Sequence, residues 1–168
     1  MHRSAGAWRT ARPQSSVEEG IVYKHILVPT DGSLPSKKAF AEALRIARAS
    51  GARLTVFHVV PPWIYPVFDE PMLNFERLER DYLVATSRAT EKILGRLSRD
   101  AKAAAVPCET HHETAANPAQ AIVDEAKAAK CDLIVMGSHG RTGLARYFLG
   151  SETARVLALT RLPVLVTH

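Results

Sequence analysis

The sequence predicts a doubly wound α/β fold, in which helices cover both faces of a single parallel β-sheet. Short runs of β-branched and apolar residues alternate with longer segments whose apolar residues recur every three or four positions. The first strand, helix and second strand follow in the order of a βαβ unit, which requires parallel strands and a right-handed crossover. A chain of 168 residues suits one domain with one core.

The first part of the chain contains a predicted tail, two strands and two helices. Residues 1–20 are polar and without periodicity, so we expect a disordered tail before a domain formed by residues 21–168. The strands are residues 23–28 and 53–60, and the helix between them has Pro35 in its first turn and ends at Gly51. Residues 61–71 are rich in proline and aromatic side chains, which predicts an irregular segment that is either a lid or a contact surface.

The remaining elements continue the alternation. A long amphipathic helix is expected over residues 72–105, with Gly95 as a candidate position for a kink. Residues 107–114 form a strand polar enough for a sheet edge, and Asn117 caps a helix that has Pro118 at its first position and runs to about Ala129. The fourth strand ends at Gly137, a last helix covers residues 151–159, and a last strand covers residues 163–167.

Composition argues against several classes of function. The chain is 46% hydrophobic and 23% charged, and its apolar runs are far shorter than the roughly 20 residues of a membrane span, so we expect a soluble protein without a membrane partner. The two cysteines lack a paired pattern, which favours a reducing, cytoplasmic compartment. The net charge is +5, but basic and acidic residues are interleaved, so no nucleic-acid partner is expected. Cys108 and Cys131 lie outside any CxxC pattern and are expected to be reduced, buried thiols. His111 and His112 are adjacent on a strand and should point to opposite faces, so no metal site is predicted.

Residues 132–153 carry the strongest functional signal. A buried strand ends at Gly137, a glycine-rich loop follows, and a helix begins at Ser151. Free backbone N–H groups at such a loop and helix start bind anions, most naturally a phosphate, and a side chain at Gly140 or Gly150 is expected to block its approach. The alternative is a long connection that merely needs flexible turns. The loop has no Walker pattern, so hydrolysis of the P-loop type is not predicted.

Two other strand ends complete a candidate site, because ligands of open α/β sheets lie beyond the carboxyl ends of the strands. Asp31 is placed to accept hydrogen bonds from ribose hydroxyls, although it could instead be a turn residue that bonds its own backbone. Backbone groups of Thr30 and Val59 could read the edge of a base. His58 is expected to be a hydrogen-bonded histidine packed at a strand end. The pattern favours a nucleotide-shaped cleft.

These residues together resemble the ATP-binding branch of the universal stress protein family. The resemblance rests on Gly137-x-x-Gly140, nine further residues and Gly150-Ser151, together with Pro29-Thr30-Asp31 and residues 163–166, and it covers roughly residues 23–167. It implies a five-stranded parallel sheet with the order 3-2-1-4-5 and a homodimer that pairs through the last strand. By position, it implies base contacts at Pro29, Thr30, Val59 and Met136, ribose contacts at Asp31 and Gly137, and phosphate contacts at His139, Gly140, Arg141, Gly150, Ser151, Glu152 and Thr153.

The function implied by this resemblance is a regulatory stress-response dimer that binds ATP or AMP, with slow or no hydrolysis. No catalytic residues are predicted, because no nucleophile is accompanied by a base and an orienting group. The alternatives are a nucleotide hydrolase or transferase of the same superfold, and a nucleotide-free dimeric scaffold; no protein client is indicated. Glu152 departs from the small or apolar residue of many ATP-binding members. It could mark a magnesium requirement or a preference for fewer phosphates, but the favoured interpretation is a solvent-facing side chain that stabilises the helix dipole.

Overall fold

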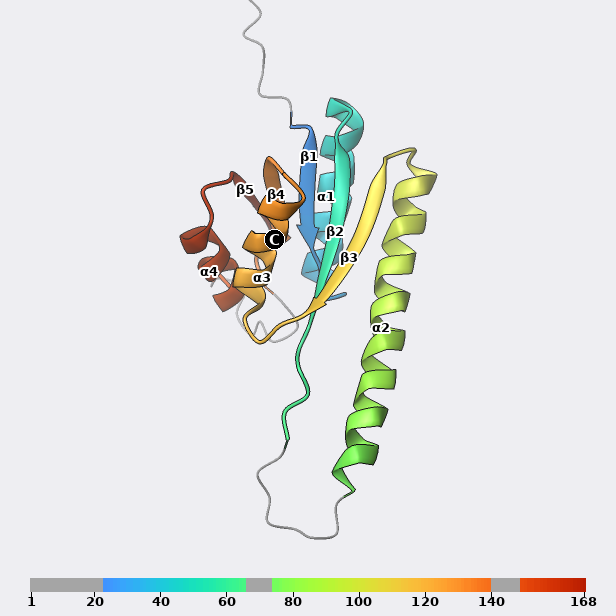
Figure 1. Ribbon diagram of the computed structural model, residues 1–168. Helices are drawn as coiled ribbons and strands as arrows, with labels where there is room; N and C mark the ends of the chain where they lie inside the picture. The colour runs from blue at the N-terminus through green and yellow to red at the C-terminus, as the bar shows by residue number, and fades with distance from the viewer. Residues whose placement is uncertain (1–22, 66–73, 140–148) are drawn as a thin grey trace, which may run out of the picture.

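The computed structural model describes residues 23–65, 74–139 and 149–168, which form one five-stranded parallel sheet between two layers of helices (Figure 1). The sheet has the order β3-β2-β1-β4-β5, and every pair of neighbouring strands is parallel. The predicted fold class and strand order are therefore confirmed. The predicted tail at residues 1–20 and the second half of the aromatic segment lie outside the described residues. In chain order the elements are β1 (His25–Pro29), α1 (Leu34–Ser50), β2 (Arg53–Val60), α2 (Phe75–Ala103), β3 (Cys108–Thr114), α3 (Pro118–Ala128), β4 (Leu133–Gly137), α4 (Ser151–Leu159) and β5 (Val164–Thr167).

Each face of the sheet buries its own apolar cluster. Ile26 and Val28 of β1 pack with apolar residues of α1 and α2, whereas Leu27, which lies between them in sequence, packs with α3 and α4. This alternation follows from the two-residue period of a strand. Because helices cover both faces, every residue of β1 and β4 is buried. Across the described residues, no helix combines the length and the apolar character needed to span a membrane.

Local sequence signals place most helix ends. The Ser33 hydroxyl accepts a hydrogen bond from the Ser36 N–H at 3.3 Å before α1, and Gly51 ends that helix with a φ of 72°, a left-handed conformation that glycine adopts readily. α2 is unbroken at Gly95. Its buried residues all lie in its C-terminal half, from Thr90 to Ala101, where the helix packs on the sheet.

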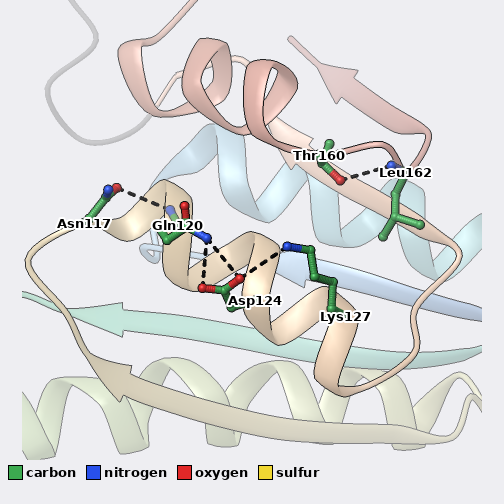
Figure 2. A network of polar contacts seen from close by, with 6 residues as sticks. All are labelled: Asn117, Gln120, Asp124, Lys127, Thr160 and Leu162. Atoms are coloured by element: carbon green, nitrogen blue, oxygen red, sulfur yellow. Dashed lines mark hydrogen bonds and ion pairs between the residues drawn. The ribbon is translucent and has the colours of Figure 1, made fainter.

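The start of α3 is also placed by a local signal. The Asn117 side chain accepts a hydrogen bond from the Gln120 N–H at 3.3 Å, as the sequence predicts (Figure 2). On the outer face of this helix, the Gln120 amide donates to both oxygens of Asp124, and Lys127 lies 3.5 Å from the same carboxylate. The cap fixes the first turn of α3, which contributes Pro118 to the cavity described below.

The third strand, β3, forms one edge of the sheet, as its polar sequence predicts, and most of its residues are exposed. The His111 Nδ1 atom lies 2.6 Å from a Glu125 carboxylate oxygen on α3, whereas His112 lines a groove against α2. The two imidazole rings therefore lie on opposite faces, as expected.

Both described cysteines are free thiols, but only one is buried. Burial raises the pKa of Cys131 to about 12 and that of Cys108 to about 11, so neither is a thiolate near neutral pH. The expectation that both are buried is wrong for Cys108, which is partly exposed because it belongs to the edge strand β3. Because both thiols have a raised pKa, Cys108 and Cys131 should react slowly with thiol reagents at neutral pH.

His25 at the start of β1 should make stability depend on pH. The side chain is 5% exposed, and its Nε2 atom lies 2.8 Å from the Thr55 hydroxyl. Burial, together with the positive charge of Arg53, lowers the pKa of His25 below its ordinary value of 6.5. The unfolded chain then binds a proton more readily than the folded chain, so stability is greatest above pH 6.5 and is lost as the pH falls below it.

We therefore expect the free energy of unfolding, measured with urea, to fall between pH 7.5 and pH 5.5 (about one pH unit on either side of an unperturbed histidine). In the variant His25→Gln, which removes the titrating group, this fall should be shallower. Equal pH dependence in the two proteins would show that another group controls stability in this range.

Candidate functional site

A cavity of about 340 Å³ opens at the carboxyl ends of β1, β2 and β4. It lies beside the position where the strand order reverses, between β1 and β4, which is where open α/β sheets bind ligands. The lining residues are Pro29, Thr30, Asp31, Ser36, Phe57, Val59, Pro118, Ile122, Met136, Gly137, His139, Gly150, Ser151, Glu152 and Thr153.

Every predicted site residue that the structure describes lines this cavity. Gly140 and Arg141 lie outside the described residues. The structure thus brings together three segments that are far apart in sequence: the turn after β1, the end of β2, and the residues on either side of the loop between β4 and α4. The individual contacts with base, ribose and phosphate stay predictions.

Four lining residues were missed by the sequence interpretation: Ser36, Phe57, Pro118 and Ile122. Phe57 could have been found, because it lies two positions before Val59 on the same strand and so shares its face. Pro118 and Ile122 are four residues apart and share one face of α3. Only the packing of α3 against the sheet shows that this face reaches the cavity.

The turn between β1 and α1 is held by a compact set of hydrogen bonds. The Thr30 hydroxyl accepts from the Gly32 N–H at 3.2 Å and donates to the Ser36 hydroxyl at 3.1 Å. Asp31 accepts from the Ser33 N–H at 3.0 Å. Asp31 therefore has the turn-forming role that was the alternative to ribose binding, and it also lines the cavity. A carboxylate has several acceptor positions, so forming the turn does not prevent it from accepting hydrogen bonds from a ligand.

The backbone of Thr30 is already used by the protein. Its N–H donates to the Phe57 carbonyl at 2.8 Å, and its carbonyl accepts from the His58 Nδ1 atom at 2.7 Å. His58 is 8% exposed and is the packed, hydrogen-bonded histidine that the sequence predicts. The expectation that the Thr30 N–H could bind a base edge is wrong, because this N–H group already donates to the Phe57 carbonyl of β2. The carbonyl oxygen keeps a second lone pair that could accept from a ligand.

The start of α4 forms one side of the cavity. The Gly150 N–H donates to the Ser138 carbonyl at 2.7 Å, and the Thr153 hydroxyl donates to the Gly137 carbonyl at 2.9 Å. These bonds fix the first turn of α4 against the end of β4. The N-cap residue, Gly150, has no side chain to cap this helix, and the N–H groups of its first turn have no acceptor within the helix. Such a helix start attracts a negatively charged group.

The protein's own backbone gives a physical reason for glycine at position 150, and the predicted approach of a phosphate stays a prediction. The φ of Gly150 is −60°, which any residue can adopt, but a Cβ atom there would lie 2.9 Å from the Ser138 carbonyl oxygen and 3.2 Å from the His139 Cα atom. The protein's own backbone therefore excludes a side chain. A valine at Gly150 would displace the backbone of Ser138 and His139 even without a ligand, so loss of binding in this variant would not show that the glycine contacts a phosphate.

Among the described residues, the charge of Glu152 at the α4 start has one ion-pair partner. The Glu152 side chain is 40% exposed, and its Oε1 atom lies 3.3 Å from Arg155 Nη1. Its Oε2 atom is shielded from solvent and has no hydrogen-bond partner within the described ranges. The favoured interpretation of Glu152 as solvent-facing therefore holds for part of the side chain only. Within those same ranges, no three His, Cys, Asp or Glu side chains are grouped so that they could hold a metal ion.

The fold and the cavity define a doubly wound α/β protein with a ligand site at its topological switch point. Residues 22–168 match the sequence model of the universal stress protein family, and the chain belongs to that family. A universal stress protein of Thermus aquaticus is 38% identical over 150 residues, which is 88% of this chain and 100% of the relative.

Solved structures agree with this assignment. The universal stress protein UspA from Lactobacillus plantarum is 29% identical, with a TM-score of 0.67 over 87% of this chain and 98% of the other. A universal stress protein solved in complex with cAMP is also 29% identical, with a TM-score of 0.64 over 88% of this chain and 98% of the other.

Proposed function

We propose that this protein is a nucleotide-binding universal stress protein that holds ATP or AMP in the cavity at the end of the sheet. One observation carries the proposal: a single cavity joins an apolar slot, a carboxylate and a helix start whose N-cap residue is a glycine. These are the three surfaces that a base, a ribose and a phosphate require. The complex of a similar family member with cAMP supports the same ligand class.

Each part of the nucleotide has a matching wall. Val59, Met136 and Ile122 offer apolar surface for the base. Asp31 offers carboxylate oxygen for the ribose hydroxyls, and the N–H groups of the first turn of α4 face the phosphate. His139 lines the cavity beside this turn, and its Nδ1 atom lies 2.8 Å from the Ser138 hydroxyl. Magnesium would accompany a triphosphate, and Glu152 is the carboxylate on that wall that could bind it through oxygen.

We further propose a regulatory role in the cytoplasm, with slow or no hydrolysis. The support is that the loop after β4 has no Walker pattern, and that the contact of Asp31 with the turn and the pair of Glu152 with Arg155 are structural contacts of these carboxylates. We also propose a homodimer that pairs through β5. This strand forms the second edge of the sheet, and its half-buried side chains Val164, Leu165 and Val166 present an apolar edge.

Calorimetric titration of protein freed from co-purified nucleotide tests the proposal. ATP and AMP should each give a saturable isotherm with one site per chain. ADP release in magnesium should stay below about 1 per second, whereas faster turnover would favour the hydrolase alternative. The absence of saturable binding of either nucleotide would contradict the proposal and favour the scaffold. Light scattering during gel filtration should give twice the mass of the 18.4 kDa chain.

A further inference from the structure

Glu152 places a carboxylate in the first turn of α4, on the wall that is proposed to face the phosphate. It lines the cavity together with its neighbours Ser151 and Thr153. The backbone N–H groups of this turn attract anions, but the Glu152 side chain adds a full negative charge to the same wall. The two effects oppose each other, and each further phosphate that lies near the carboxylate increases the repulsion.

Nothing in the described structure fully offsets this charge. Oε1 pairs with Arg155, but the two side chains are 40% and 63% exposed, and such surface pairs interact weakly. Oε2 is shielded from solvent and has no hydrogen-bond partner among the described residues. A carboxylate oxygen that is shielded from water and unpaired is strongly stabilised by a bound cation and strongly destabilised by a nearby phosphate oxygen.

We propose that Glu152 makes the cavity select nucleotides by phosphate charge, in a way that depends on divalent cations. The proposal rests on the proposed function, because it assumes that the nucleotide phosphates face α4. Without a divalent cation, a nucleoside monophosphate is preferred to a triphosphate, because the extra phosphates add negative charge near the carboxylate. With a divalent cation, which the carboxylate and the phosphates can both bind through oxygen, the preference for the monophosphate is lost.

The test is calorimetric titration of the full chain with AMP and with ATP, each in EDTA and in magnesium chloride, for the wild type and Glu152→Gln. This substitution keeps the shape of the side chain and removes its charge. In EDTA it should raise the affinity for ATP by about tenfold, and that for AMP by less than about threefold. The gain in ATP affinity on adding magnesium should be smaller in Glu152→Gln than in the wild type.

The matched control is Glu91→Gln, which makes the same change of charge on α2, the helix that covers the opposite face of the sheet. Its ratio of ATP to AMP affinity should equal that of the wild type in both buffers. If wild type and Glu152→Gln bind both nucleotides with the same ratio in EDTA, or if Glu152→Gln weakens ATP, the inference is wrong and the proposed function stands. If neither nucleotide binds to any of the three proteins, the proposed function fails, and the inference fails with it.

Discussion

Replacing Gly137 with alanine should destabilise the protein by about 1–3 kcal/mol, the usual cost of adding a methyl group to a well-packed interior. Gly137 ends β4 and is buried beneath the start of α1. A Cβ atom at this position would lie 2.8–3.0 Å from the backbone and Cβ atoms of Pro35. Real Cβ atoms almost never come this close to other atoms, so either α1 or β4 must shift. Neither can shift easily, because both are packed in the sheet core.

The control for this prediction is Gly95→Ala in α2. There a Cβ atom would meet only the flexible end of the Arg99 side chain, at 3.5 Å. Alanine favours a helix over glycine, so this variant should be more stable than the wild type by about 0.5–1 kcal/mol. Urea denaturation of the three proteins measures both effects. Equal stability of wild type and Gly137→Ala would show that the contact between β4 and α1 is looser than the structure indicates.

Replacing Asp31 with alanine should weaken the binding of ATP and AMP by similar factors, each about 10–100-fold, because a hydrogen bond to a charged group contributes about 1.5–3 kcal/mol. The proposed partner of Asp31 is the ribose, which both nucleotides share. The phosphates face α4, on another wall of the cavity, so the number of phosphates should not change the loss. Calorimetric titration with the two nucleotides gives the two ratios directly. A loss confined to ATP would contradict the ribose role.

A second variant separates ribose binding from the turn. Asp31 also accepts a hydrogen bond from the Ser33 N–H, so alanine removes a structural bond as well. Asparagine keeps an oxygen for Ser33 but replaces the charged acceptor with an amide. We expect Asp31→Asn to recover the wild-type thermal stability while nucleotide binding stays weakened. If asparagine restores binding as well, the effect of alanine comes from the turn and not from the ribose.

Many local features of this protein follow from short stretches of sequence. Asn117 followed by Pro118 starts α3, Gly51 ends α1, and the β-branched and aromatic residues of 53–60 form β2 with the predicted bounds. Such signals depend on backbone conformation and on hydrogen bonds within one turn, so no distant contact is needed to interpret them. The polar residues of 107–114 predict an edge strand, but the exposure of the Cys108 side chain was misjudged, because it depends on which other elements pack over it.

The candidate site likewise has features that follow from short stretches of sequence and features that depend on distant contacts. The residue types at the strand ends can be identified in the sequence: a carboxylate at Asp31, glycines at 137 and 150, and a helix start at Ser151. How these residues are used follows from the three-dimensional structure, because their hydrogen-bond partners and close contacts come from segments far away in the chain. The Thr30 N–H donates to the Phe57 carbonyl, and the Ser138 carbonyl occupies the space that a side chain at position 150 would need. Phe57 and Ile122 line the cavity because the sheet packs against α3. A residue's type limits the bonds it can make, but its neighbours in space decide which of those bonds remain for a ligand.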